Sequence, residues 1–82
     1  MSYSIPQGVR SGIDDYVANH REQGGFVTSV LRNDLKWAVM RADPASFAAL
    51  KVILLYCSNE IPPRCWGSPE RVDAWLQSEV PA

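Results

Sequence analysis

The chain has 82 residues, of which 46% are hydrophobic and 21% are charged. This length supports one hydrophobic core and the composition is that of a folded globular protein, so we expect a single helical domain over residues 1–82 and exclude a disordered chain. Eight Lys and Arg stand against nine Asp and Glu, for a formal net charge of −1, which argues against a general nucleic-acid-binding protein, because such proteins gather basic residues against phosphates.

An apolar stripe with helical spacing predicts a first helix over residues 5–21. The stripe consists of Val9, Ile13, Tyr16, Val17 and His20. We expect Ser4 to cap the start of this helix, since Pro6 follows in its first turn. Gly24 and Gly25 are expected to stop it, because glycine commonly follows the last residue of a helix.

A second helical stretch is predicted over residues 26–41. Its apolar positions keep helical spacing at Val27, Leu31, Leu35, Ala38 and Ala42. Asn33 and Asp34 interrupt the pattern, because their side chains compete for backbone amides and favour helix starts over helix interiors. We therefore expect either two short helices that meet near Asn33 or one kinked helix.

Asp43 and Pro44 mark the start of the next helix, which we expect over residues 44–58. Apart from its last residue, only Ser46 and Lys51 are polar within it. A helix that is apolar all round has to be surrounded by other elements, so this helix is expected to be the centre of the fold. Its nearly fully buried residues are expected to be Leu50, Ile53 and Leu54.

A second capping pattern predicts a short last helix over residues 69–77. Ser68 stands at the N-cap, Pro69 follows in the first turn, and Glu70 adds an acid beside the helix N-terminus. No segment of five or more residues alternates with period two, so no strand is expected. The predicted fold is all-α, a compact array of four to five short helices around the central apolar helix.

The chain offers little catalytic or metal-binding chemistry. His20 is its only histidine, which excludes paired-histidine metal sites, and we interpret it as a packing residue at a helix end. Cys57 is expected to pack as a small hydrophobe, whereas Cys65 falls in a loop where it can reach solvent but has only His20 as a candidate base. We expect free thiols rather than a disulfide, and no enzyme, catalytic residue, cofactor or metal site.

Nucleotide, DNA and membrane binding are also disfavoured. The five glycines form no phosphate-binding loop pattern, and the candidate recognition helices carry too few Arg, Lys, Asn or Gln to read DNA. The longest apolar run, residues 52–57, is far shorter than the roughly 18 residues of a membrane span. Residues 1–6 show no secretory signal, so we expect a cytoplasmic protein.

Trp37 lies off the apolar stripe of its predicted helix. A large exposed ring is costly without a use, and interface hot spots are enriched in Trp and Arg. We therefore expect a partner-binding surface at Arg32, Lys36 and Trp37. In the alternative interpretation Trp37 packs against the first helix and enlarges the core, because a kink at Asn33 can rotate this face.

Four blocks of the chain resemble a family of small proteins encoded by tailed bacteriophages and prophages. Residues 25–35, GFVTSVLRNDL, resemble the GxFLxAVLxNDL block of that family. Residues 41–43, 59–62 and 65–70 are similar to its RAD, NExP and CWGSPE blocks, in the same order and at similar spacing. The resemblance implies a phage or prophage origin and a place in the host cell cytoplasm. It carries no assigned activity or catalytic residue.

Two classes of function follow. In the first, a small phage or prophage accessory protein binds a protein of the host or of a bacterial defence system. In the second, the chain is a homo-oligomeric structural or nucleic-acid-associated phage protein, whose basic surface is assembled only in the oligomer. Mixed charge around exposed aromatic residues would favour the first class, and a contiguous stripe of Lys and Arg the second.

Overall fold

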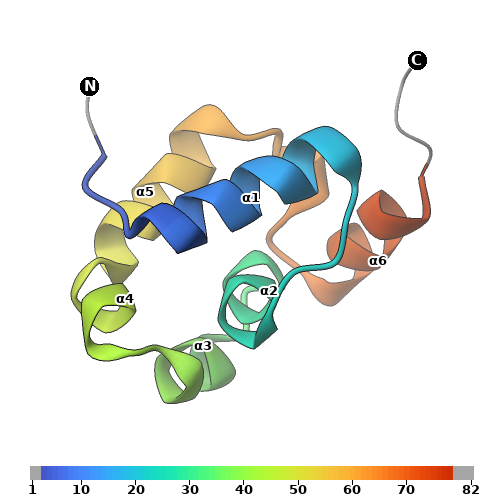
Figure 1. Cartoon of the computed structure of the whole chain (residues 1–82). Coiled ribbons are helices and arrows are strands. Elements are labelled where there is room, and N and C mark those ends of the chain that lie inside the picture. The colour runs from blue at the N-terminus through green and yellow to red at the C-terminus, as the bar shows by residue number, and fades with distance from the viewer. Residues whose placement is uncertain (1–2, 79–82) are drawn as a thin grey trace.

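The computed structural model describes residues 3–78, which form six α-helices, one short 3-10 turn and no strand. These elements are α1 (Gln7–Asn19), α2 (Gly25–Leu31), α3 (Leu35–Arg41), α4 (Pro44–Ala48), α5 (Leu50–Glu60), the turn η1 (Pro63–Cys65) and α6 (Pro69–Gln77). The predicted all-α class is confirmed. In Figure 1, α1 crosses the upper part of the molecule, α4 and α5 lie at the left, α2 and α3 below, and α6 at the right. None of the described helices is long and apolar enough to cross a bilayer.

Helix α1 is shorter than predicted at both ends. Pro6 is its N-cap residue, with extended backbone (φ −52°, ψ 134°), and no side chain caps the start, so the predicted Ser4 cap is wrong. At the other end His20 takes the left-handed conformation, with φ 55°, and its amide donates to the Tyr16 carbonyl. The helix therefore stops before Gly24 and Gly25, because His20 supplies the conformation that glycine usually provides.

The predicted interruption at Asn33 and Asp34 is confirmed as a turn between two short helices. Asn33 has a positive φ of 59°, a conformation that Asn tolerates better than most residues. Asp34 caps α3, because its side chain accepts a hydrogen bond from the amide of Trp37. The two side chains thus act as turn and cap residues, as their chemistry indicates.

The helix predicted over residues 44–58 is divided into α4 and α5. Its predicted cap is confirmed: the Asp43 side chain accepts a 2.7 Å hydrogen bond from the Ser46 amide. At Ala49 the backbone leaves helical geometry, with φ −93° and ψ 2°. Hydrogen bonds continue on both sides, from the Ala49 amide to Ala45 and from the Ile53 amide to Ala49, so the chain turns at this residue while its hydrogen-bond ladder continues.

The prediction that this stretch is surrounded on all sides is wrong. Ile53 is fully buried as predicted, but Leu50 is only partly buried and Leu54 is 36% exposed. Leu55, beside it in α5, also faces solvent. The reason is size: a chain this short has too few elements to cover every side of α5, which therefore keeps a solvent face.

The core lies where α1, α2, α5, η1 and α6 meet. Its largest fully buried side chains are Tyr16, Ile13, Leu31, Ile53, Val72, Cys57 and Cys65. Long-range hydrogen bonds join the elements around this core. The Gly67 amide donates to the Leu31 carbonyl at 2.7 Å, and the Trp75 indole donates to the Tyr16 carbonyl at 3.0 Å. The short α2 is thereby held between α1 and α6.

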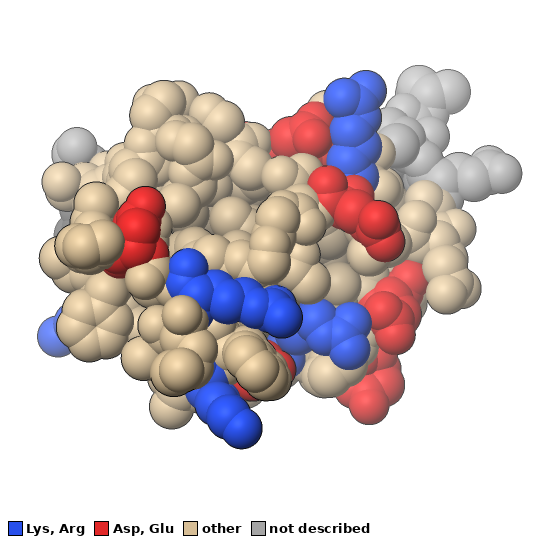
Figure 2. All heavy atoms as spheres, turned by 60° about the horizontal axis from the view of Figure 1, so that its bottom comes forward, with Lys and Arg blue, Asp and Glu red and all other residues tan. Residues whose placement is uncertain are grey.

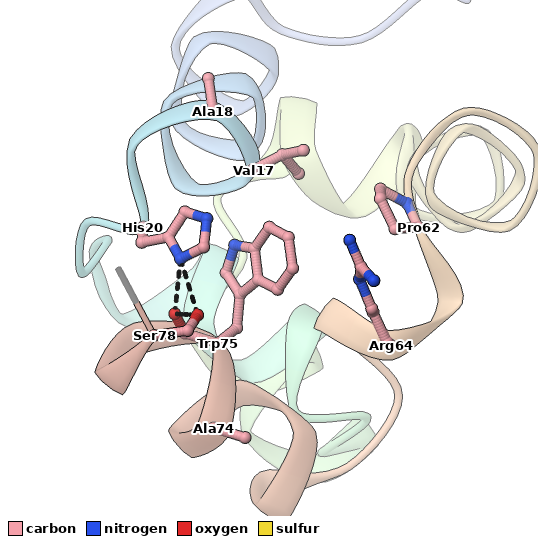
Figure 3. Close-up of a pocket in the computed structure, with 8 residues that line it drawn as sticks. All are labelled: Val17, Ala18, His20, Pro62, Arg64, Ala74, Trp75 and Ser78. Atoms are coloured by element: carbon pink, nitrogen blue, oxygen red, sulfur yellow. Dashed lines mark hydrogen bonds between the residues drawn. The ribbon is translucent and has the colours of Figure 1, made fainter. Parts of the chain in front are cut away.

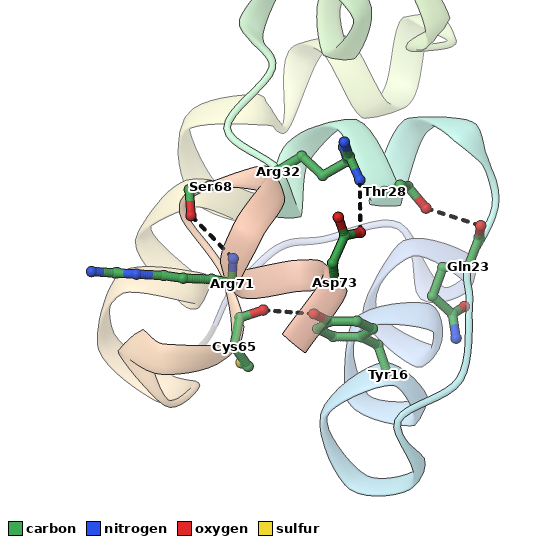
Figure 4. A network of polar contacts seen from close by, with 8 residues as sticks. All are labelled: Tyr16, Gln23, Thr28, Arg32, Cys65, Ser68, Arg71 and Asp73. Carbon is green, nitrogen blue, oxygen red and sulfur yellow. Dashed lines mark hydrogen bonds and ion pairs between the residues drawn. The ribbon is translucent and has the colours of Figure 1, made fainter. Parts of the chain in front are cut away.

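The predicted Ser68 cap of α6 is confirmed, since the Ser68 hydroxyl accepts a hydrogen bond from the Arg71 amide (Figure 4). Cys57 packs in the core as predicted. Cys65, whose loop position suggested access to solvent, is instead fully buried. The turn η1 directs it inward, where its thiol donates to the Pro62 carbonyl. Both cysteines are free thiols.

Candidate partner-binding surface

Helix α3 turns most of its apolar side chains to solvent. Its only buried residue is Ala38, while Leu35 and Met40 are 68% and 69% exposed. The placement of Leu35 on a core-facing stripe with Leu31 is therefore wrong. That stripe assumed one continuous helix, and the left-handed residue at Asn33 breaks the helical phase between α2 and α3.

We call the exposed residues of this helix the α3 surface. They form three rows of residues four apart: Leu35 with Val39, Lys36 with Met40, and Trp37 with Arg41. Residues four apart are neighbours on a helix, so each row presents a continuous strip of side chain. Leu35 and Val39 form an apolar row on one flank, Trp37 and Arg41 form the other flank, and Lys36 and Met40 lie between them.

Trp37 is the largest side chain of the α3 surface. Its side chain is 44% exposed, so the alternative interpretation, in which it packs against the first helix within the core, is wrong. The Arg41 guanidinium carbon lies 5.0 Å from the ring centroid and the Lys36 ammonium 5.3 Å from it. Both distances are those of cation–π contacts.

Arg41 is itself fixed against α2. Its Nη1 donates a 3.3 Å hydrogen bond to the Ser29 hydroxyl, and its side chain passes close over Gly25. The ring of Trp37 therefore rests on an arginine that a neighbouring helix holds in place. An anchor that is ordered before binding loses less conformational entropy when a partner covers it.

Of the three predicted site residues, the structure brings Lys36 and Trp37 together and turns Arg32 elsewhere. Arg32 is the C-cap residue of α2, and its guanidinium forms a 3.3 Å ion pair with Asp73 of α6 (Figure 4). Sequence reasoning missed Arg41, although its position four residues after Trp37 on the same helix was a usable signal.

Acidic residues at the two ends of α3 are engaged with backbone amides. Asp34 accepts from the Trp37 amide and Asp43 from the Ser46 amide. The latter hydrogen bond lowers the pKa of Asp43, because it stabilises the carboxylate. Figure 2 views the molecule from the α3 side, and its blue basic side chains gather across the lower middle between tan residues, with most red ones toward the edges.

The other titratable groups show structural roles. Among residues 3–78 no three His, Cys, Asp or Glu side chains gather as a metal-binding set. Burial raises the pKa of the Cys57 thiol to about 12 and raises that of Cys65 as well. His20 stacks on Trp75 with ring centroids 4.0 Å apart, which confirms its interpretation as a packing residue at a helix end.

Comparison with protein-family models, with curated proteins and with solved structures finds no match to this chain. No residue role is therefore carried over from another protein. The function has to be inferred from the α3 surface and from the block pattern along the sequence.

Proposed function

We propose that this chain is a small phage- or prophage-encoded accessory protein that has no catalytic site and binds a protein of the host cell or of a bacterial defence system. The α3 surface is the proposed contact. The observation that carries the proposal is Trp37, an exposed ring held between Lys36 and Arg41 on a helix that buries only Ala38. The four blocks between residues 25 and 70, which resemble those of a phage and prophage family, support the phage origin.

The composition of the α3 surface favours a protein partner over nucleic acid. Leu35 and Met40 offer flexible apolar area beside the rigid ring of Trp37, and such aromatic and Met-rich surfaces are typical of protein interfaces. Figure 2 shows basic side chains gathered on this face, but Lys36 and Arg41 lie among Leu35, Trp37 and Met40, and this mixture of apolar and basic side chains favours a protein partner over a phosphate backbone. The expected partner surface has an apolar recess for the indole and acidic residues around it.

Capture of partners from a bacterial host lysate tests this proposal. Tagged wild-type chain, Trp37→Ala and the control Phe47→Ala are immobilised at equal density. Phe47 is also an exposed aromatic residue, at 56%, but lies on α4. Trp37→Ala is expected to weaken capture by about tenfold or more, because truncating a tryptophan anchor typically costs at least ~2 kcal/mol of binding. Phe47→Ala is expected to leave it unchanged.

A thermal melt of each variant confirms that it is folded. Equal capture by wild type and Trp37→Ala would reject the α3 surface as the contact. Equal losses in Trp37→Ala and Phe47→Ala would reject it too, because the loss would then not be specific to α3. Lys36→Ala is expected to slow association and to reduce its dependence on salt, since a rim charge acts mainly on the association rate.

Homo-oligomerisation is the second candidate, and the outer face of α5 favours it. Leu54 and Leu55 are both partly exposed there, at 36% and 45%. A second copy that covered this face would bury both leucines. Sedimentation velocity over a range of concentrations tests this: an oligomer that Leu55→Lys converts to monomer, and that Trp37→Ala leaves intact, would support it. A wild-type monomer throughout the range would reject it.

A further inference from the structure

A groove of about 660 Å³ lies between the end of α1, the turn η1 and α6. Its apolar lining consists of Val17, Ala18, Pro62, Ala74 and Trp75. Figure 3 shows the Trp75 indole with His20 against one side and an open space on its other side, toward Pro62 and Arg64. The groove shares no residue with the α3 surface, so a test of one proposal does not decide the other.

The wall of this groove is fixed before any ligand arrives. The Trp75 indole donates to the Tyr16 carbonyl at 3.0 Å, and its ring stacks on His20 at an interplanar angle of 19°. His20 Nδ1 lies 2.8 Å from the Trp75 carbonyl oxygen. Because that oxygen can only accept, Nδ1 carries a proton and donates. His20 and Trp75, which are 55 positions apart, are thus joined by both a ring stack and a hydrogen bond.

Among the residues 3–78 that line the groove, Arg64 is the only Lys, Arg, Asp or Glu. Its guanidinium carbon lies 5.6 Å from the centroid of the Trp75 ring, and Figure 3 shows it facing the indole across the open space, beside Pro62. No acidic side chain among residues 3–78 forms an ion pair with it. The groove therefore combines apolar walls with one cation, which lies within cation–π distance of Trp75 and has no acidic partner among residues 3–78.

We propose that this groove binds a small molecule with a flat apolar body and a single anionic group. Its volume falls within the ~300–1,000 Å³ of typical small-molecule sites, which likewise combine apolar walls with a few placed polar groups. The apolar body packs between Val17, Pro62 and Trp75, and the anion binds the Arg64 guanidinium, whose planar donors match a carboxylate or sulfonate.

Two probes that differ by one sulfonate test the charge requirement. The anionic probe is anilinonaphthalenesulfonate and the uncharged one is phenylnaphthylamine, the same rings without the sulfonate. Wild-type chain is expected to bind the anionic probe with one saturable site in a fluorescence titration, and the uncharged probe more weakly. Arg64→Gln is expected to weaken binding of the anionic probe by about fivefold or more, because the charged hydrogen bond is lost. It is expected to change the affinity for the uncharged probe by less than about twofold. Arg21→Gln, another exposed arginine, is the matched control.

A second pair of variants locates the probe. Ala74→Leu fills the groove from the exposed side of α6 and is expected to abolish binding of both probes, whereas Ala48→Leu, exposed on α4, is expected to abolish neither. The proposal is overturned by any of four results: no saturable binding to wild type, equal affinities of Arg64→Gln and wild type for the anionic probe, unchanged binding in Ala74→Leu, or loss of binding in Trp37→Ala.

Discussion

The hydroxyl of Tyr16 donates a 2.7 Å hydrogen bond to the carbonyl oxygen of Cys65, 49 residues further along the chain (Figure 4). Both residues are buried, so neither group has water as a substitute partner. Burial also raises the pKa of Tyr16, which keeps its hydroxyl protonated as a donor. The bond joins α1 to η1 and so helps to place the loop that orients both Cys65 and Arg64.

Removing this hydroxyl is expected to destabilise the fold. Tyr16→Phe keeps the ring but leaves the Cys65 carbonyl buried without its donor, which costs about 1–3 kcal/mol. Urea denaturation measures the free energy of unfolding. Tyr3→Phe is the matched control: Tyr3 is only partly buried and its hydroxyl accepts a long 3.4 Å hydrogen bond from Asn59, so the expected change is within about 0.5 kcal/mol. Equal effects of the two variants would contradict the role given to Tyr16.

Two neighbouring residues of α5 are expected to differ sharply when truncated. Ile53→Ala removes a side chain that is fully buried and is expected to cost about 2–5 kcal/mol, from lost burial and the cavity left behind. Leu54→Ala is expected to cost less than about 2 kcal/mol, because over a third of that side chain already faces water. Thermal melts of both variants check the order, and a Leu54→Ala variant less stable than Ile53→Ala would restore the central-helix interpretation of α5.

Ser68 is expected to act as a helix cap and not as a nucleophile. Ser68→Ala removes the acceptor of the Arg71 amide and is expected to lower the free energy of unfolding by about 1 kcal/mol. The control is Ser58→Ala within α5, where the hydroxyl only donates back to the Leu54 carbonyl and alanine is the better helix former, so a change near zero or slightly stabilising is expected. An unchanged stability for Ser68→Ala, measured by denaturation, would contradict the cap.

Helix boundaries were predictable where the side chain of a residue next to the helix caps it. Asp43 and Ser68 cap the helices that follow them because the chemistry is contained within three residues. The end of α1 was not predictable in the same way. His20 holds a left-handed conformation beside a contact with Trp75, 55 residues away, and no local pattern carries that information.

The same difference between local patterns and long-range contacts applies to the candidate site. The position of Trp37 off the apolar stripe left open whether it is exposed or packs against the first helix, and the structure shows it exposed. Periodicity shows which residues share a face but not which face lies inward, and it therefore misplaced Leu35 and Leu54. The ion pair of Arg32 with Asp73 joins residues 41 positions apart, which the sequence does not encode as a pattern.

The buried thiol of Cys57 gives the stability of the protein a specific dependence on alkaline pH. Its pKa is raised to about 12 by burial, against roughly 8.5 in an unfolded chain. The native state therefore keeps a proton that the unfolded state releases. The stability that comes from keeping this buried thiol protonated is fully present below the pKa of Cys57 in the unfolded chain. It is lost as the pH rises toward the pKa of Cys57 in the folded protein, at a rate of at most about 1.4 kcal/mol per pH unit.

Cys57→Ala is accordingly expected to flatten the fall in the free energy of unfolding between about pH 9 and pH 12, although it lowers stability at neutral pH by removing core volume. Urea denaturation at a series of pH values measures this slope. Val30→Ala is the matched control, since Val30 is also buried in the core but has no titratable group, and its curve should run below that of the wild type and parallel to it. If Cys57→Ala also gave a parallel curve, the thiol would not be the group that loses its proton on unfolding.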